Sequence, residues 1–207
     1  MKKKMIFTIL FTFIILFSGS IFAQEEGSVT ESDSKSTKDR LKYSLNMCPG
    51  GIVFGIFSAN IEYLFNPSHG LVVRFDYESI PKNYTEASIE ASGVAFILNY
   101  RWHFSNKMNS VYLGAFSRYR VYKGKGTIES TNFEFTIPEL TIGLNIGKRW
   151  VWKSGFNINL AFGYGISKTW RTANPSNSST ESMIDAFENA YDFIDPFLGE
   201  FSIGYAF

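Results

Sequence analysis

The residues best suited to covalent chemistry in this sequence are His103 and Ser105, which one residue separates and Asn106 follows. A serine becomes a nucleophile when a histidine accepts its proton and a third group, usually a carboxylate, orients that histidine. No Asp or Glu occurs between Ser105 and Glu129, so the neighbouring sequence lacks the orienting group. His103 also lies on the polar side of an alternating segment. We therefore expect a histidine that faces the interior at a strand end, and no catalytic residues.

The other residues that bind metals or form disulfides are too few to build a site. His69 falls in a turn-rich segment without a metal-binding partner nearby, and Cys48 is the single cysteine of the chain. One cysteine cannot form an internal disulfide. The net charge of +1 gives no reason to expect a nucleic-acid partner. We expect neither a metal nor another cofactor.

The segment 171–195 combines apolar residues at helical spacing with a run of acidic residues. Its apolar positions are Met183, Ile184, Phe187, Tyr191 and Ile194, and its acidic ones are Glu181, Asp185, Glu188, Asp192 and Asp195. This pattern predicts a short amphipathic helix or lid, with a contact site for a cationic ligand, a divalent ion or a host protein. The alternative is a solvated acidic loop whose apolar underside packs on the rim of the fold.

The chain that positions these residues begins with an export signal. Lys2, Lys3 and Lys4 precede the apolar run 5–17, and small residues lead to Ala23. This order is typical of a signal peptide, so residues 1–23 are expected to be removed near Ala23. Residues 24–40 are polar and predict a flexible periplasmic leader. The alternative, an apolar helix that stays in the membrane, is too short to span it.

From residue 41 onward, apolar and polar residues alternate with the period of a β-strand. The alternation predicts eight strands, at residues 41–48, 52–65, 71–78, 93–104, 111–121, 139–150, 156–167 and 197–207. Short connections at 66–70, 105–110 and 153–154 alternate with longer ones at 81–90, 124–132 and 171–195. Residues 49–51 predict a tight turn, and Pro138 predicts a bulge or a bend where the phase of Phe133, Phe135 and Ile137 changes.

The polar face of these strands is unusual because it holds glycines together with charges of both signs. The charged set is Lys42, Glu62, Arg74, Asp76, Glu78, Arg101, Arg118, Arg120, Glu139, Arg149 and Glu200. Small residues and paired charges suit the crowded interior of an eight-stranded barrel, so the apolar face would meet lipid. The sequence thus predicts an all-β fold, an eight-stranded antiparallel up-and-down transmembrane β-barrel over residues 41–207. A soluble barrel with an apolar core is the alternative.

The last strand and two further segments resemble known outer-membrane proteins. Phe201, Ile203, Tyr205 and the terminal Phe207 resemble the assembly signal of outer-membrane barrels, which implies recognition by the barrel-assembly machinery. Residues 100–104 and 155–164 resemble an uncharacterised branch of small barrels with the layout of OmpX, OmpA and OmpW. His103 to Asn106 also resembles the His-x-Ser-Asn of lipid A deacylases. The Glu that such deacylases carry about a dozen residues later is absent here, which disfavours a catalytic role.

These observations together predict an integral protein of the cell outer membrane, in contact with outer-membrane lipid. Its expected role is structural or surface-interactive and non-enzymatic, with paired charges closing the lumen. The alternative is an OmpW-like conduit for small hydrophobic molecules, at which Ile52, Ile56, Ile97 and Phe116 on the interior face hint. A lipid-modifying enzyme is the least favoured interpretation.

Overall fold

Strands make up most of the chain after residue 42. The computed structural model describes residues 41–52, 55–80, 89–128, 131–191 and 196–207. In chain order the elements are β1 (Tyr43–Met47), α2 (Pro49–Ile52), β2 (Ile56–Asn66), β3 (His69–Ile80), β4 (Glu90–His103), β5 (Val111–Ile128), β6 (Thr131–Val151), β7 (Phe156–Thr169), β8 (Thr172–Asn174), α3 (Ser178–Tyr191) and β9 (Phe197–Ala206). The proposed signal peptide, the leader and residues 81–88 of the expected loop 81–90 lie outside the described residues, and Glu90 is already strand.

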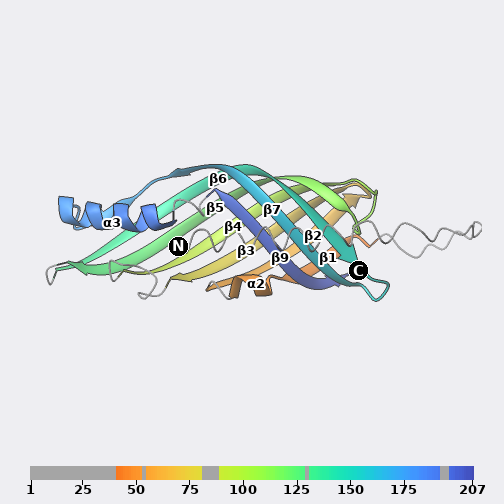
Figure 1. Ribbon diagram of the computed structural model, residues 1–207, viewed down its shortest axis with the longest axis horizontal. Coiled ribbons are helices and arrows are strands. Elements are labelled where there is room, and N and C mark those ends of the chain that lie inside the picture. The colour runs from red at the N-terminus through yellow and green to blue at the C-terminus, as the bar shows by residue number, and fades with distance from the viewer. Residues whose placement is uncertain (1–40, 53–54, 81–88, 129–130, 192–195) are drawn as a thin grey trace, which may run out of the picture. The chain divides into compact units, whose positions relative to one another are not determined.

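Eight of the described strands close into a ring. Each strand from β1 to β6 pairs antiparallel with the next, β7 pairs with β9, and β9 also pairs with β1. The short β8 extends the sheet beside β6. The chain therefore forms the predicted eight-stranded antiparallel up-and-down barrel, shown in Figure 1. No helix among the described residues is long and apolar enough to cross a membrane.

The two ends of the barrel differ. At one end, the hairpin end, β5 and β6 extend past the other strands toward α3. The other end is the C-terminal end. It contains the last residue of the chain and the connections 67–68, 104–110 and 152–155. These connections are the short ones that the sequence predicted.

The hairpin of β5 and β6 contradicts two predictions made from the sequence. Residues 124–128 and 131–132 are strand, so the expected loop 124–132 is wrong. The pairing of β5 with β6 also runs without interruption from Val111↔Lys148 to Ile128↔Thr131, so Pro138 causes no bulge in it. The carbonyl of Pro138 accepts a hydrogen bond from Trp170 N–H, 2.9 Å away, between the end of β7 and the start of β8. A proline has no backbone N–H to donate. It fits here because the ladder of β6 is interrupted between its pairing with β8, which ends at Thr136, and its pairing with β7, which begins at Glu139.

Since the register does not change, the phenylalanines of β6 face inward rather than outward. They form a buried apolar cluster with the start of β4, with β5 and with the underside of α3. The cluster comprises Ile89, Ala91, Tyr122, Phe133, Phe135, Ile137, Ile184 and Phe187. The outward side chains at the same height, such as Lys123, Lys125 and Glu134, are exposed and polar. The hairpin end therefore has the apolar core and polar surface of a soluble protein.

Helix α3 confirms the helical spacing predicted between residues 181 and 191, and its apolar side covers this cluster. Asn177 caps the helix, because its Oδ1 accepts a hydrogen bond of 2.9 Å from the N–H of Thr180. Replacing Asn177 with alanine should destabilise α3 locally by about 0.5–2 kcal/mol. Hydrogen exchange should quicken in α3 and stay unchanged in β4. Ser182→Ala, on the exposed side of the helix, is the matched control and should not quicken exchange.

The connection between β1 and β2 also departs from the sequence prediction. Residues 49–52 form the short helix α2 rather than a tight turn, and β2 begins at Ile56 rather than at residue 52. Ile52 is 60% exposed, so it does not line the interior. β1 consequently has only 5 residues, whereas its neighbours β2 and β9 have 11 and 10.

Candidate functional site: the polar interior

The barrel interior contains the predicted charged residues with one exception. Lys42 precedes β1 and is exposed, so its placement in the lumen is wrong. The other ten side chains are buried inside the barrel: Glu62, Arg74, Asp76, Glu78, Arg101, Arg118, Arg120, Glu139, Arg149 and Glu200. With Lys42 outside, five arginines face five carboxylates within the predicted set. Buried charges are tolerable only when paired, and this set balances in number.

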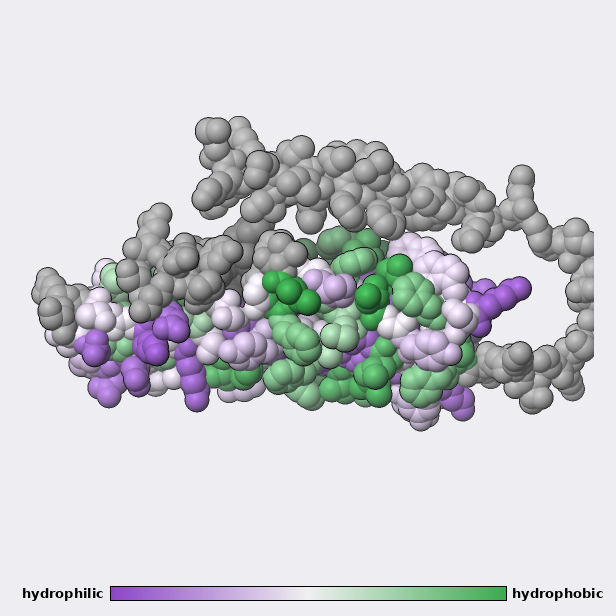
Figure 2. Space-filling model, turned by 90° about the horizontal axis from the view of Figure 1, so that it is seen from below, coloured by the Kyte–Doolittle hydropathy of each residue, from purple (hydrophilic) through white to green (hydrophobic). Residues whose placement is uncertain are grey.

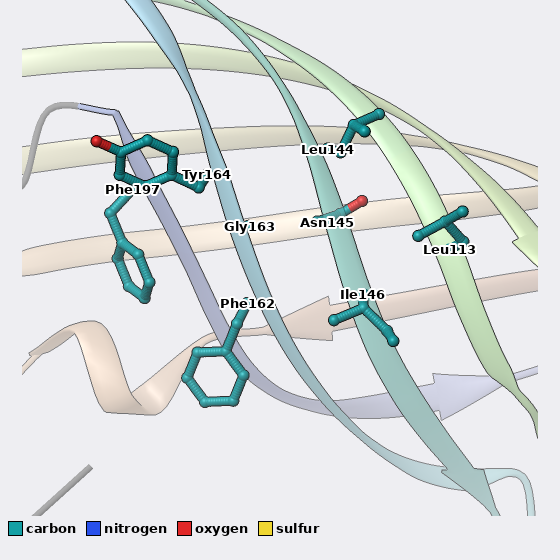
Figure 3. Close-up of a pocket in the computed structure, with 8 residues that line it drawn as sticks. All are labelled: Leu113, Leu144, Asn145, Ile146, Phe162, Gly163, Tyr164 and Phe197. Carbon is teal, nitrogen blue, oxygen red and sulfur yellow. The ribbon is translucent and has the colours of Figure 1, made fainter. Parts of the chain in front are cut away.

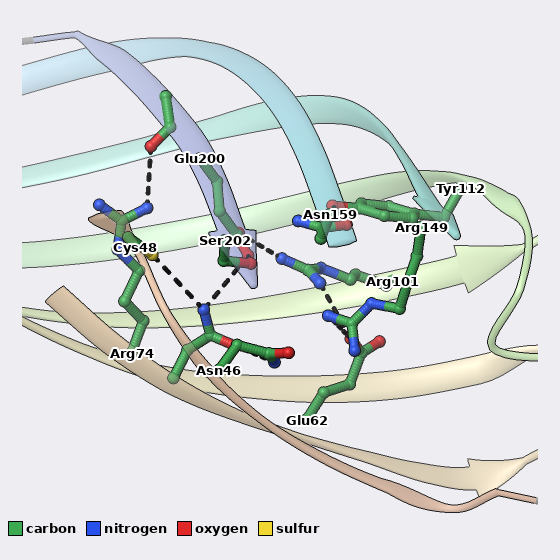
Figure 4. A network of polar contacts seen from close by, with 12 residues as sticks. Asn46, Cys48, Glu62, Arg74, Arg101, Tyr112, Arg149, Asn159, Glu200 and Ser202 are labelled. Atoms are coloured by element: carbon green, nitrogen blue, oxygen red, sulfur yellow. Dashed lines mark hydrogen bonds and ion pairs between the residues drawn. The ribbon is translucent and has the colours of Figure 1, made fainter. Parts of the chain in front are cut away.

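Glu62 is the centre of the network nearer the C-terminal end. Its carboxylate lies 2.9 Å from Arg101 Nη1, 2.7 Å from Arg149 Nη2 and 2.9 Å from His103 Nε2. Figure 4 shows Arg101 and Arg149 reaching this carboxylate from other strands. All four side chains are fully buried. One acid on β2 thus connects β4 and β6 across the lumen.

Glu200 extends the same network to β9, on the other side of β1 from β2. It accepts hydrogen bonds from Arg101 Nη2 at 2.6 Å, Ser202 Oγ at 2.9 Å and Asn60 Nδ2 at 3.2 Å. The guanidinium of Arg101 also stacks over the ring of Tyr112, 4.5 Å from its centroid. Arg101 of β4 therefore reaches across the lumen and joins two acids on the strands that flank β1.

A second network lies nearer the hairpin end, around Glu139. Its two oxygens accept hydrogen bonds from Arg118 at 3.0 Å and Arg120 at 2.6 Å. Arg120 also lies 3.7 Å from Glu78, which accepts a hydrogen bond from the hydroxyl of Tyr122. Strands β3, β5 and β6 are joined by these contacts.

A buried apolar cluster lies inside the barrel beside the polar networks. It consists of Ala95, Ile97, Phe116 and Leu198, and we call it the middle apolar layer. The buried ion pair of Arg74 with Asp76, 2.7 Å apart, borders it, because these two residues of β3 lie across from Ile97 and Ala95 of β4. Glycine is required next to this cluster. A Cβ on Gly143 would lie 2.7 Å from the ring of Phe116, closer than carbon atoms can approach.

The histidine and serine that could have formed a catalytic pair are not joined in the structure. His103 is fully buried and its Nε2 faces Glu62, whereas Ser105 is exposed beyond the end of β4. No hydrogen bond links these two described side chains; the backbone N–H of Ser105 instead donates to Ser110 Oγ at 2.9 Å. The acid beside His103 was missed from the sequence because 41 residues separate Glu62 from it. Only the stagger of the strands brings them together.

The acidic residues of α3 converge on one arginine, which the sequence interpretation did not anticipate. Arg171 lies 3.0 Å from Glu181 and 3.1 Å from Glu188, and it also pairs with Asp185. The hydrogen bond from Arg171 to Asp185 raises the pKa of Arg171, and partial burial raises the pKa of Glu188. Asp192, Ile194 and Asp195 lie outside the described residues. Three of the five acids therefore share one arginine, whose single positive charge balances only one of them.

The outward face of the barrel is apolar over most of its height. Large exposed side chains form what we call the outward band: Leu45, Phe57, Ile61, Leu71, Phe75, Val94, Phe96, Leu98, Leu113, Tyr119, Ile142, Leu144, Ile146, Tyr164, Phe201, Ile203 and Tyr205. Figure 2 shows apolar residues over the middle of one face and hydrophilic ones toward the hairpin end. The band also contains a shallow groove of about 370 Å³ across β5, β6, β7 and β9, shown in Figure 3.

The residues that resemble an assembly signal belong to this outward face. Phe201, Ile203 and Tyr205 of β9 are exposed, as is the terminal Phe207, while Glu200 and Ser202 on either side of Phe201 face inward. The ring of Phe207 stacks on Tyr43 with centroids 5.8 Å apart. The final strand thus closes the barrel and presents a row of apolar side chains outside.

Two solved barrel structures resemble this chain at low identity. The crystal structure of Acinetobacter baumannii CarO2 has 12% identity and a TM-score of 0.41, covering 80% of this chain and 97% of that one. That of Acinetobacter baumannii CarO has 12% identity and a TM-score of 0.38, covering 84% of this chain and 100% of that one. No curated protein matches the sequence. A family model described as "Protein of unknown function (DUF3575)" matches residues 40–195, so the chain belongs to the DUF3575 family.

Proposed function

We propose that this protein is an integral outer-membrane β-barrel with a structural or surface-interaction role, whose lumen is closed by paired charges and which is not an enzyme. The observation that carries the proposal is the reversal of the usual packing. Large apolar residues surround the barrel outside, while five arginines and five acids are buried inside. Such an outer surface is stable only against lipid, because in water it would be an exposed apolar patch far larger than soluble monomers tolerate.

The dimensions of the band support the same conclusion. On β6 its apolar positions lie within residues 140–150, a run as long as the roughly 9–11 residues that a tilted strand needs to cross hydrocarbon. Lys148 on this face lies close to the end of the run, where a long side chain can reach the interface. The short connections at the C-terminal end would be periplasmic and the hairpin end extracellular, as in outer-membrane barrels. The barrel-assembly machinery would recognise β9.

The buried networks support a closed rather than a porin-like lumen. An eight-stranded barrel has room inside for side chains and little else, and the networks around Glu62 and Glu139 extend from wall to wall. Ions moving along the axis would have to break both networks.

Reconstitution in planar lipid bilayers tests whether the lumen is closed. We expect the protein to insert without large, stable conductance steps, because ion pairs fill the cross-section at two levels. An open porin recorded in the same lipid is the positive control. Large steps that persist through several protein preparations would contradict a closed lumen. Recovery of the protein from the soluble periplasm after cell fractionation would instead contradict the membrane location.

A conduit for small hydrophobic molecules is the second candidate, and the middle apolar layer is the observation that favours it. Ile97 and Phe116, two of the four interior residues that suggested a conduit, are buried in this layer. Its four residues offer the apolar contacts inside the barrel that such a molecule would need.

A further inference from the structure

A lysine interrupts the apolar run on the outward side of β6. Lys148 is partly buried, and it lies between Val111 of β5 and Leu160 of β7, its partners on the two neighbouring strands. In the described part of the chain no acid acts on its ammonium group, whereas the like charge of Lys107 does. Two positive charges held together without an acid attract an anion from outside the chain.

The connection between β4 and β5 holds Lys107 beside the end of β6. Met108, the next residue, is buried and packs with Val151 at that end. Asn109 Nδ2 also donates a hydrogen bond to the carbonyl of Val151, 3.4 Å away. Lys107 itself is exposed. We call Lys107 and Lys148 the lysine pair, and both lie toward the C-terminal end of the barrel.

The shallow groove of the outward band begins next to the lysine pair. Leu113 and Ile146 oppose each other on β5 and β6 and line the groove. The next outward residues toward the C-terminal end are Val111 and Lys148, which also oppose each other. The other outward side chains that line the groove are apolar or aromatic, as Figure 3 shows: Leu144, Phe162, Tyr164 and Phe197. The surface is therefore apolar along the groove and positive at its C-terminal end.

We propose that the groove and the lysine pair bind one phospholipid with an anionic headgroup, whose phosphate lies against Lys107 and Lys148 and whose acyl chain lies in the groove. The site rests on the proposed membrane location of the barrel, and the proposed orientation places it in the periplasmic leaflet. A phospholipid fits because its phosphate and its chain are joined in the same order as the positive and apolar parts of this surface.

The charge of the lysine pair selects the headgroup. A phosphatidylglycerol headgroup carries one negative charge and no positive one, so both lysines attract it. A phosphatidylcholine headgroup brings a positive charge of its own, which the lysine pair repels. An isolated lysine at the membrane interface would attract anionic headgroups without holding a chain. In the proposed site, the headgroup decides which acyl chain occupies the groove.

Photolabelling in vesicles tests whether headgroup and chain bind together. Two probes carry the same photoreactive diazirine midway along one acyl chain, and they differ only in having a phosphatidylglycerol or a phosphatidylcholine headgroup. Each is added in trace amount to phosphatidylcholine vesicles that contain the folded protein. After illumination, mass spectrometry compares adducts on Leu144 and Phe162 in the groove with those on Phe75, an exposed outward residue of β3. The ratio of groove adducts to Phe75 adducts is the enrichment.

The phosphatidylglycerol probe should be enriched in the groove, and the phosphatidylcholine probe should not. Lys107→Ala and Lys148→Ala should each lower the enrichment about fivefold, because one basic residue near a membrane surface strengthens the attraction of anionic lipid by about that factor. Lys148→Arg keeps the charge and should keep the enrichment. Lys42→Ala is the matched control and should change nothing, because Lys42 is exposed just before β1, which β9 and β7 separate from β6.

Equal enrichment of the two probes would overturn the site, as would enrichment that survives the loss of both lysines of the pair. Inorganic phosphate added as a competitor should leave the enrichment unchanged. If it abolished the enrichment, the lysine pair would bind phosphate alone, and the phospholipid would be the wrong ligand. Failure of the wild-type protein to fold into vesicles would instead contradict the membrane location.

Discussion

Arginine at position 144 is expected to destabilise the barrel in phospholipid vesicles by about 2–4 kcal/mol relative to alanine at the same position. Leu144 is 63% exposed at the middle of the outward band, so the guanidinium would enter hydrocarbon. The same comparison at Phe156, near the C-terminal end, should give only about 0–1 kcal/mol because the side chain can reach the interface. Using alanine as the reference at both positions removes the contribution of lost packing, including that of Phe156 on Trp152.

The measurement is urea-dependent folding into vesicles, followed by the change in electrophoretic mobility that accompanies barrel formation. The expected result is that arginine costs more stability at position 144 than at position 156. Equal costs at positions 144 and 156 would show that the outward face does not lie in a bilayer. Folding of the wild-type protein to the same extent without lipid would support the soluble-barrel alternative.

Replacing Glu62 with leucine should produce a still larger effect, a loss of about 3–5 kcal/mol, because it removes one partner from a buried group of charges. Arg101 would keep Glu200, but Arg149 would lose the only acid that pairs with it in the described residues. An unpaired buried guanidinium has no water to replace the lost carboxylate. The free energy of unfolding is again measured with urea in vesicles.

Two further variants separate the loss of charge balance from simple loss of packing. Adding Arg149→Leu to Glu62→Leu should recover part of the stability, because the double variant no longer buries an unpaired charge. Glu90→Ala, which breaks the exposed pair with Lys125, should change stability by less than about 1 kcal/mol. If Arg149→Leu destabilised the Glu62→Leu variant as much as it destabilises the wild-type protein, the two residues would not be coupled.

The strands could be predicted from the sequence because the two-residue period of a strand is independent of what surrounds it. The prediction failed at 124–132 because Gly124 and Gly126 are typical of loops. In the structure these glycines make room for aromatic rings across the hairpin. A Cβ on Gly124 would lie 2.2 Å from the ring of Phe135, and one on Gly126 would lie 2.6 Å from that of Phe133.

The interior face could be predicted, but the contacts across it could not. Alternation assigns Glu62 and Arg149 to the inside of their strands without indicating that they meet, because that depends on the stagger of β2 relative to β6. The truncation of β1 was missed for a related reason. Residues 52 and 56 continue the alternating pattern, so the sequence places both of them in a strand. Where β1 ends and β2 begins depends instead on pairing with neighbouring strands, which the pattern does not show. Lys42 was misplaced because the pattern extends one residue beyond the start of β1.

The uninterrupted register of β5 and β6 limits how this hairpin can change during evolution. Both strands pass from outward-facing apolar residues to inward-facing ones without a shift in register. A single residue inserted into β6 before the hairpin end would turn Phe133 and Phe135 outward, and one inserted into β5 would turn its lysines inward. Insertions and deletions within the ladder should therefore occur two residues at a time and equally on both strands, so that relatives of different hairpin length differ by even numbers.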